Sequence, residues 1–359
     1  MPDTAQLESF TAGVETAVDV AQIDRQLKEL WQLAADSKGE AAGQTITRAC
    51  LLNLVAVSET ETERDHLTET ITTLTSRDPC RAIVLLAQPD ATRAELSAAI
   101  TAHCHLASGG KQVCCEQINI VGTGASATHL VSAVLPLLES DLPTVVWWPG
   151  NFLRLGELFR RLSAVADRVI FDTSGWRDPE THLAALARAI AEYPRANFAD
   201  LSWTRLAWWR KMAAEMFDDA ACRAELSKLH SIQLMHGSGP GAALRALLMA
   251  SWFASQLDWT VAEAAEKIHL QCRNDTDAPA VGILSIELRG ADATFTIRKN
   301  YGEATASATI NTSGACGLPR KRAFWPTDDA SLLSQELDQS SRHNVYERAL
   351  AMAAQLAAH

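Results

Sequence analysis

Along its first two thirds, the chain alternates short apolar runs with amphipathic stripes, which predicts strands and helices in turn. The clearest strand is Thr144–Trp148, a β-branched and aromatic run that Pro143 precedes and Pro149-Gly150 ends. Other strands are predicted at residues 50–57, 82–87, 112–121 and 169–172, and helices at residues 21–35, 60–75, 127–138, 152–166, 178–193 and 203–217. Strands that alternate with helices predict a mostly parallel α/β sheet.

Local signals refine several of these elements. Pro136 should shorten or kink the helix that contains it. Asn151 and Asp178-Pro179 are typical helix starts. Residues 94–104 fit either a short helix or a strand, and Ser108-Gly109-Gly110 predicts a turn after them.

The pattern changes near Lys228. A strand at 231–235 and a long apolar helix to residue 257 precede three period-two strands at 283–288, 294–298 and 305–310, which predict an antiparallel meander. The tail returns to helix at 330–337 and 345–356. We therefore expect an N-terminal helical arm and linker (1–43), an α/β domain (44–225) and a smaller α+β domain (226–359).

The bulk composition is that of a folded protein with an acidic balance. Among 359 residues the net charge is −11, which disfavours nucleic acid or an anionic membrane as the main partner. The polar, acidic N-terminus does not resemble a signal peptide, and the apolar segment 242–259 carries Arg245 and Asp258. We therefore expect a cytoplasmic protein with no membrane span.

Eight cysteines are scattered through the chain without a CxxC motif, so reduced thiols are the default expectation. His103-Cys104-His105 and Cys114-Cys115 gather five soft ligands, but the usual zinc spacing is missing and we expect no metal. Two interpretations stay open for Cys104, Cys114 and Cys115: a redox role, or packing as small apolar core residues.

Two glycine-rich turns lie between a strand and a helix. One contains Gly122 and Gly124, and the other contains Gly237, Gly239 and Gly241. Their backbone amides are candidates for holding a phosphate, although a plain tight turn is the simpler interpretation. A complete GxGxxG and a Walker lysine are both missing, so no cofactor is predicted. The sequence also lacks GxSxG and HExxH, the signatures of two common hydrolase classes.

The segment Asp200–Arg210 is the densest aromatic and basic cluster. Trp203 and Arg210 share one helical face, and Trp209 lies beside it. Tryptophan and arginine dominate interface hot spots, but a buried helix with snorkelling arginines fits as well. Trp147 and Trp148 are likewise either core residues or a binding surface at the end of their strand. A basic island, 318–326, is suited to an exposed loop or to an acidic partner surface.

Several motifs occur here in an order that resembles the OpcA family, the glucose-6-phosphate dehydrogenase assembly proteins of cyanobacteria and actinobacteria. They are Arg77–Val84, Cys114–Ile118, Leu135–Leu138, Ser140–Pro143 with Trp147-Trp148, Ala166–Val169 with Asp172–Ser174, Asp200–Arg205 with Trp209-Arg210, Leu247–Trp259 and Val345–Leu350. The resemblance implies a non-catalytic effector that binds glucose-6-phosphate dehydrogenase, promotes its active oligomer and supports the oxidative pentose phosphate pathway. In cyanobacteria it also implies thioredoxin-dependent redox control through cysteines.

On this basis we expect Trp203, Arg205, Trp209 and Arg210, with Trp147 or Trp148, to form the partner contact. A sugar-phosphate- or nucleotide-binding enzyme that uses the glycine turns is the alternative, and an interaction scaffold for another partner is a third.

Overall fold

The computed structural model describes residues 10–12, 14–36, 46–107, 111–176, 178–193, 195–273, 282–300, 302–312, 315–316, 320–339 and 344–359. The chain forms two compact units. Unit 1 comprises Met1–Phe171, Arg195–Phe198 and Asp328–Ser340, and unit 2 comprises Asp172–Pro194, Ala199–Thr327 and Ser341–His359. The domain boundaries expected at residues 43 and 225 remain predictions. The turn expected at Ser108–Gly110 and nearly all of the linker before residue 44 lie outside the described residues.

The first sheet is mostly parallel, as predicted. Its order is β1 (Thr16–Val18), β5 (Glu95–Ala107), β6 (Lys111–Thr123), β4 (Cys80–Gln88), β3 (Leu52–Ser58), β7 (Thr144–Trp148), β8 (Arg168–Phe171) and β9 (Asn197–Asp200), and β2 (Ile46–Arg48) pairs with β6. The antiparallel pairs are β1 with β5 and β5 with β6. Strands β3 and β7 are buried at every position, and β4 at all but its last, which explains their continuous apolar sequences.

The parallel strands follow a doubly wound order. From β3 in the middle of the sheet, the chain moves outward through β4 to β6, and then returns to β7 before continuing to β8 and β9. The strand order therefore reverses between β3 and β7, and doubly wound proteins usually bind their ligands at this point.

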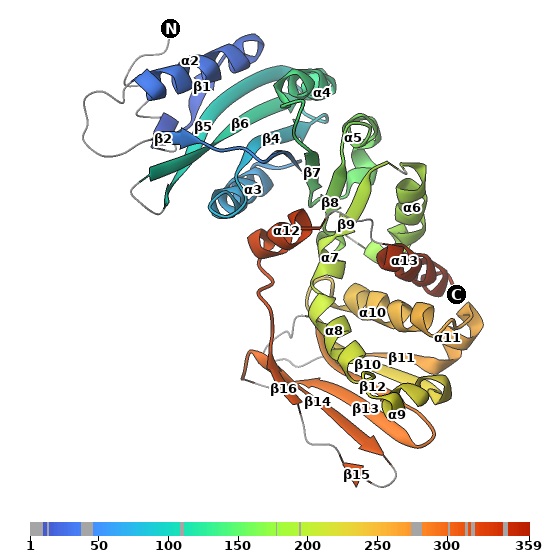
Figure 1. The fold of residues 1–359 in the computed structure, drawn as a ribbon. Coiled ribbons are helices and arrows are strands. Elements are labelled where there is room, and N and C mark those ends of the chain that lie inside the picture. The colour runs from blue at the N-terminus through green and yellow to red at the C-terminus, as the bar shows by residue number, and fades with distance from the viewer. Residues whose placement is uncertain are drawn as a thin grey trace. The chain divides into compact units, whose positions relative to one another are not determined.

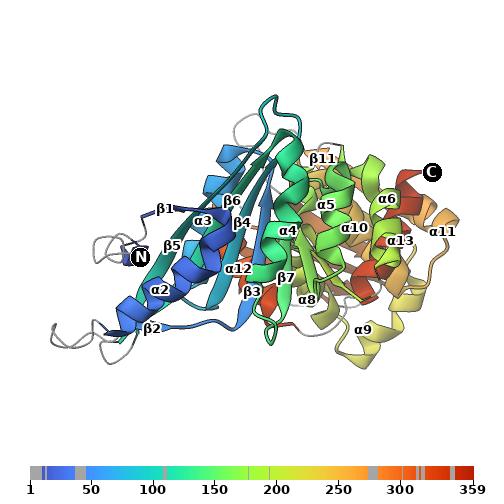
Figure 2. The same cartoon turned by 90° about the horizontal axis from the view of Figure 1, so that it is seen from above.

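Helices cover both faces of this sheet within unit 1. In Figure 1, α3 (Glu61–Leu74) and α12 (Asp329–Leu337) lie on one side, and α2 (Ile23–Asp36), α4 (Leu130–Val134) and α5 (Gly156–Ser163) lie on the other, from which Figure 2 views the sheet. The shortening expected at Pro136 is confirmed, because α4 ends at Val134 and a 3-10 turn, η4 (Leu135–Leu137), follows. Asn151 caps as expected, although a 3-10 turn, η5 (Phe152–Leu155), precedes α5.

Unit 2 contains the second sheet, and the predicted meander is confirmed as β12 (Ile283–Arg289), β13 (Ala293–Lys299) and β14 (Thr305–Thr312). Beyond β12 lie β10 (Ser231–Gly237) and the edge strand β11 (Ile268–Arg273), and β15 (Ala315–Cys316) and β16 (Arg320–Ala323) pair with β14. The apolar helix α10 (Ala242–Gln256) packs on β10, and α13 (Asn344–Ala357) packs on α10 and α6 (Pro179–Glu192).

The remaining described elements are short: η1 (Val20–Gln22), η6 (Thr173–Gly175), α7 (Leu201–Thr204), α8 (Ala207–Glu215), α9 (Ala220–Ala224), η7 (Leu226–Lys228) and α11 (Val261–Lys267).

Some local expectations were wrong. The single helix expected at 203–217 is two helices, α7 and α8, separated by a turn at Arg205-Leu206. Asp178 precedes α6 in a left-handed conformation (φ 46°), and its side chain does not cap the helix. Strands β9 and β11 were not predicted, because β9 is short and β11 is exposed along most of its length. None of the described helices combines the length and apolarity that crossing a membrane requires.

Candidate functional site: a buried cluster of carboxylates and arginines

Two carboxyl groups meet in unit 2 at the carboxyl ends of neighbouring strands. Asp172 directly follows β8, and Asp200 is the last residue of β9. Ser202 bridges them, since its backbone N–H donates to Asp200 Oδ1 at 2.9 Å and its hydroxyl donates to Asp172 Oδ1 at 3.0 Å. The exposed fractions are 8% for Asp172 and 1% for Asp200, so both groups depend on the protein for their hydrogen bonds.

Further donors surround each carboxyl group. Asp200 accepts the Thr173 hydroxyl at 2.6 Å and the Thr173 N–H at 3.1 Å, and the Tyr346 hydroxyl of α13 donates to it at 3.3 Å. Asp172 accepts the Ser174 hydroxyl at 2.6 Å and a guanidinium N–H of Arg205 at 2.7 Å. This cluster (Asp172, Thr173, Ser174, Asp200, Ser202, Arg205 and Tyr346) joins η6, α7 and α13 within unit 2, and we call it the Asp172–Asp200 cluster.

The environment shifts the proton affinity of Asp200. Burial raises the pKa of Asp200 to about 7, and the neighbouring charge of Asp172 adds to the rise, while hydrogen bonds from Thr173 and Ser202 oppose it. Burial also raises the pKa of Tyr346 well above its ordinary value, with Asp200 as a further cause. Asp200 is therefore a protonated acid in mildly acidic solution and becomes ionised near neutral pH.

Asp200→Asn should change how stability depends on pH. An unfolded aspartic acid ionises near pH 4, whereas folded Asp200 keeps its proton until about pH 7. Between these values the folded state binds more protons, so this group makes the wild-type protein lose stability as pH rises. Asparagine cannot ionise, so we expect the free energy of unfolding of the variant, relative to that of the wild-type protein, to rise by a few kcal/mol between pH 5 and pH 8.

Urea unfolding at several pH values measures this difference, and the exposed Asp90→Asn is the matched control. A gap between Asp200→Asn and wild type that does not change with pH would show that Asp200 is ionised throughout.

The second glycine turn lies against this cluster. Gly241 has φ +64°, and a Cβ on it would lie 2.6 Å from Ser174 Cβ and 3.0 Å from an Nη1 nitrogen of Arg245. The sequence therefore needs glycine at Gly241, both for its backbone conformation and for the close approach of the chain. Gly237 ends β10, and Gly239 accepts the Ala242 N–H at 3.1 Å.

The first glycine turn is explained by packing. A Cβ on Gly122 would lie 2.8 Å from Leu130 Cγ, and Gly124 has φ +50° with its Cβ position 2.9 Å from the Ala91 carbonyl oxygen. The segment that follows is a six-residue 3-10 turn, η3 (Gly124–His129). The tight-turn interpretation accounts for both residues, and a phosphate role for them remains only a prediction.

The position that binds nucleotides in doubly wound proteins is occupied by acidic residues. After β3 ends at Ser58, the chain continues as Glu59-Thr60-Glu61, with no glycine. A carboxylate oxygen of Glu63 accepts the N–H groups of Glu59 and Thr60 at 2.9 and 3.2 Å, and the Thr60 hydroxyl accepts the Glu63 N–H at 3.2 Å. This capping box satisfies N–H groups at the start of α3 and surrounds them with negative charge, so a pyrophosphate is disfavoured there.

The predicted tryptophan and arginine surface is not exposed. Trp147 and Trp148 are completely buried, and Trp203 and Trp209 are 3% and 6% exposed. The two arginines make internal contacts, Arg205 with Asp172 and Arg210 with the Trp203 carbonyl and ring, the guanidinium lying 3.6 Å from the ring centroid. The expectation of an exposed face is therefore wrong for the tryptophans, which pack inward, whereas Arg205 and Arg210 are half-buried. A role in partner binding remains a prediction. In the basic island, by contrast, Arg320, Lys321 and Arg322 are exposed.

Two of the three redox candidates form a disulfide in unit 1. Cys104 of β5 and Cys114 of β6 are directly opposite in the antiparallel register, with their Cα atoms 4.0 Å apart, and their sulfurs are bonded. The expectation of reduced thiols is therefore wrong for this pair, because the pairing of the two strands brings them together. Cys115 is a free, buried thiol, as are Cys80 and, less buried, Cys50. Burial raises the pKa of Cys115 to about 11, which keeps it a thiol.

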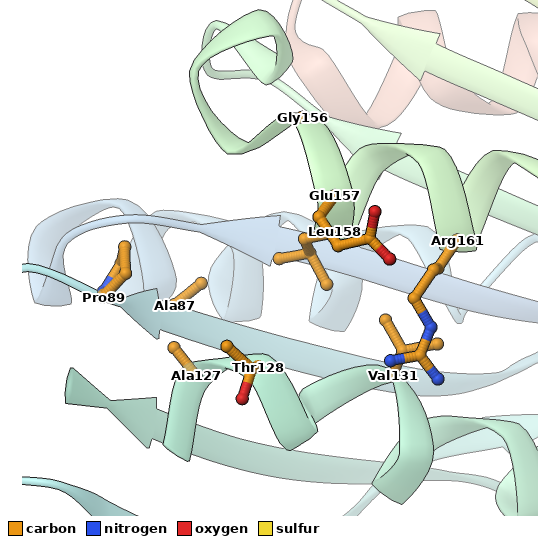
Figure 3. Close-up of a pocket in the computed structure, with 9 residues that line it drawn as sticks. All are labelled: Ala87, Pro89, Ala127, Thr128, Val131, Gly156, Glu157, Leu158 and Arg161. Atoms are coloured by element: carbon orange, nitrogen blue, oxygen red, sulfur yellow. The ribbon is translucent and has the colours of Figure 1, made fainter. Parts of the chain in front are cut away.

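Unit 1 also has a cavity of about 300 Å³ beyond the end of β4. Figure 3 shows that α5 contributes Gly156, Glu157, Leu158 and Arg161 to one side and that η3 and α4 contribute Ala127, Thr128 and Val131 to the other, with Ala87 and Pro89 at the strand end. Its lining is mostly apolar, and Thr128, Glu157 and Arg161 are its polar side chains. Within the described part of the chain, no three His, Cys, Asp or Glu side chains are arranged to hold a metal ion.

The fold and the site define a two-unit, doubly wound α/β protein whose usual nucleotide position is closed and whose main polar cluster is buried. Residues 71–188 match the family model described as "Glucose-6-phosphate dehydrogenase subunit N-terminal domain", and residues 196–350 match the corresponding C-terminal domain. The chain belongs to the OpcA family.

Its relatives include two proteins described as "Putative OxPP cycle protein OpcA". The one from Nostoc punctiforme is 33% identical over 189 residues and the one from Synechocystis is 32% identical over 190 residues. These alignments cover 51% and 52% of this chain but only 39% of each relative. Among solved structures, a variant of KijD10, a 3-ketoreductase from Actinomadura kijaniata, aligns over 86% of this chain and 96% of its own with 10% identity and a TM-score of 0.48, too low to support an inference.

Sequence reasoning found the motifs of the Asp172–Asp200 cluster without finding the cluster. Asp172, Asp200 and Tyr346 lie within motifs that carry the family resemblance. The available signal was the position of the two acids, since Asp172 directly follows β8 and Asp200 ends β9.

Proposed function

We propose that this protein is a non-catalytic partner of glucose-6-phosphate dehydrogenase that favours the active oligomer of the enzyme and so supports the oxidative pentose phosphate pathway. The observation that carries the proposal is the pair of family matches, which together span most of the chain. To activate its target, the partner must bind the active state more tightly than the inactive state.

Two features of the site support a non-catalytic role. N–H groups at the start of α3 already donate hydrogen bonds within its capping box, which disfavours a dinucleotide at the point where the strand order reverses. The acid pair that is suited to proton transfer is buried, since Asp200 is 1% exposed and all its oxygens accept hydrogen bonds from the protein. An enzyme acting on a sugar phosphate or nucleotide remains the alternative, and turnover by this chain alone would support it.

We propose that Trp203, Arg205, Trp209 and Arg210 stabilise the surface that contacts the partner by packing below it. Trp203 of α7 packs against Tyr346 of α13, with ring centroids 5.6 Å apart, and the guanidinium of Arg210 of α8 lies over the Trp203 ring. These contacts fix α7 and α8 to α13. A rigid surface loses less entropy on binding, which favours affinity. Trp147 and Trp148 play the same part inside unit 1 in this proposal.

We further propose that the Cys104–Cys114 disulfide makes the effector redox-responsive, with thioredoxin as the reductant. A thioredoxin dithiol would be oxidised to a disulfide as the two protein sulfurs become thiols. Cys104 is only partly buried while Cys114 is fully buried, so attack at Cys104 is the accessible route. The disulfide joins β5 to β6, and its loss would loosen this pair.

The test is the initial rate of the cognate glucose-6-phosphate dehydrogenase, titrated with this protein after oxidation or after reduction by thioredoxin. We expect a saturable rise in rate, no turnover by this protein alone, and a higher half-maximal concentration after reduction. No change in rate in either condition would overturn the proposed partnership.

Cysteine variants separate the redox proposal from the partnership. In Cys104→Ser/Cys114→Ser the two conditions should give the same titration curve, whereas Cys222→Ser, which removes a free thiol, should keep the difference. Activation that is identical in both conditions for the wild-type protein would end the redox proposal and leave the partnership intact.

A further inference from the structure

The first turn of α10 has an unusual charge pattern. The helix begins after Gly241, which provides no side-chain cap, and its first turn contains no acidic residue. Instead its fourth residue is Arg245, whose cationic side chain is only 5% exposed. A helix N-terminus carries partial positive charge and unsatisfied N–H groups, so a buried cation at this position is electrostatically unfavourable without an anion.

Arg245 lacks a counter-ion among the residues that the structure describes. Its side chain donates one hydrogen bond, from Nη2 to the Pro240 carbonyl oxygen at 2.9 Å, and no carboxylate of the described residues lies within ion-pair distance. Its Nε and Nη1 donors have no hydrogen-bond partner in the described part of the chain. Buried charges are normally paired with an opposite charge.

The surroundings increase the local positive charge. Burial lowers the pKa of Arg245, and the nearby charge of Arg205 lowers it further, while Asp172 and Asp200 oppose the shift. Arg205 is already paired with Asp172 at 2.7 Å, so Asp172 is shared between two guanidinium groups. Among the described residues, Asp172 and Asp200 therefore offset the charge of Arg245 only from beyond ion-pair distance.

Two glycines bring the backbone close to the guanidinium. Cβ positions on Gly241 and Gly282 would lie 3.0 Å from Nη1 and 3.7 Å from Nε of Arg245, and both glycines have positive φ, +64° and +84°. The backbone can therefore approach the guanidinium closely, as it does where a chain wraps around a small anion.

We infer that Arg245, the first turn of α10 and the backbone at Gly241 form a binding site for a small oxyanion, and that its ligand is the phosphoryl group of a phosphorylated metabolite. A phosphate accepts several hydrogen bonds and matches both an arginine fork and the N–H groups of a helix start. Binding would supply the missing counter-charge for Arg245. The site involves residues of this chain only, so the inference does not depend on the proposed binding to glucose-6-phosphate dehydrogenase.

Thermal unfolding at constant ionic strength tests the site, with inorganic phosphate, glucose 6-phosphate and neutral glucose as probes. We expect a saturable rise in Tm with the two phosphates and none with glucose, because a ligand that binds only the folded state stabilises it. A larger rise with glucose 6-phosphate than with inorganic phosphate would identify a phosphorylated metabolite as the source, and equal rises would assign the site to free phosphate.

Arg245→Met keeps the apolar stem of the side chain and should abolish the phosphate response. The exposed Arg289→Met is the matched control and should keep it. Without phosphate, Arg245→Met should be at least as stable as the wild-type protein, since it removes a buried charge that has no ion-pair partner among the described residues. A phosphate response that survives in Arg245→Met would overturn the assignment.

Hydrogen–deuterium exchange on the wild-type protein gives a second readout that does not depend on a folded variant. Phosphate should slow exchange in the peptide that contains residues 237–247 and leave β12 to β14 unchanged. Unchanged exchange in that peptide, together with an unchanged Tm, would show that no anion binds.

Discussion

Gly241→Ala should lower the free energy of unfolding by about 3 kcal/mol, one of the largest effects expected of any single methyl group in this protein. The added Cβ would lie 2.6 Å from Ser174 Cβ and 2.8 Å from Ser174 Cα. Since the second contact is to backbone, no side-chain rotation relieves it. The positive φ of Gly241 adds about 1 kcal/mol for any L-residue.

Two glycines separate these contributions. Gly302 has φ +73° and nothing within 4 Å of its Cβ position, so Gly302→Ala measures the backbone term alone, about 1 kcal/mol. Gly175 lies next to Ser174 in open space without a positive φ, so Gly175→Ala should be nearly neutral. Urea unfolding with an unchanged m-value is the measurement. Equal losses for Gly241→Ala and Gly302→Ala would show that η6 and the start of α10 are not in close contact.

The parallel core was predictable because its sequence signals are local. Thr144–Trp148 carries β-branched and aromatic residues between two prolines, and it forms β7 with no position exposed. The meander was equally readable from its period of two, which the buried and less buried positions of β13 reproduce. In both places a run of five to seven residues contains all the information required.

The Asp172–Asp200 cluster was not predictable in the same way, because its parts come from separate segments. Asp172, Asp200 and Tyr346 meet only after β8, β9 and α13 are in place. The tryptophans show the same limit. Residue type suggested a contact surface, but Trp203 lies under Arg210 and beside Tyr346, and only the tertiary structure decides which way a helix faces.

The Cys104–Cys114 disulfide was only partly predictable from the sequence. Residues 94–104 fitted a helix or a strand, and the structure shows the strand β5 paired with β6. Choosing the strand and turning the chain at residues 108–110 would have set Cys104 opposite Cys114. The ambiguity in one element therefore concealed a covalent bond.

Glu336→Gln should cost about 3–5 kcal/mol, because it removes one member of a buried ion pair. Within unit 1, Glu336 of α12 accepts a hydrogen bond from Arg168 of β8 at 2.9 Å, and the side chains are 1% and 6% exposed. Arg168 also donates to the Gln339 carbonyl oxygen at 2.6 Å. Burial already lowers the pKa of Arg168 against the opposing effect of Glu336, so losing the carboxylate would remove the charge that opposes the cost of burying this guanidinium.

The double variant Arg168→Met/Glu336→Met distinguishes a missing partner from missing packing. Replacing both charges by apolar side chains of similar length should restore most of the lost stability, since neither charge then needs desolvating. The more exposed pair of Arg289 and Glu287, with side chains 52% and 26% exposed, is the control, and Glu287→Gln should cost less than about 1 kcal/mol. If the double variant were as unstable as Glu336→Gln, the hydrogen bond to Gln339 would be what holds α12 against the sheet, and the charge pair would contribute little.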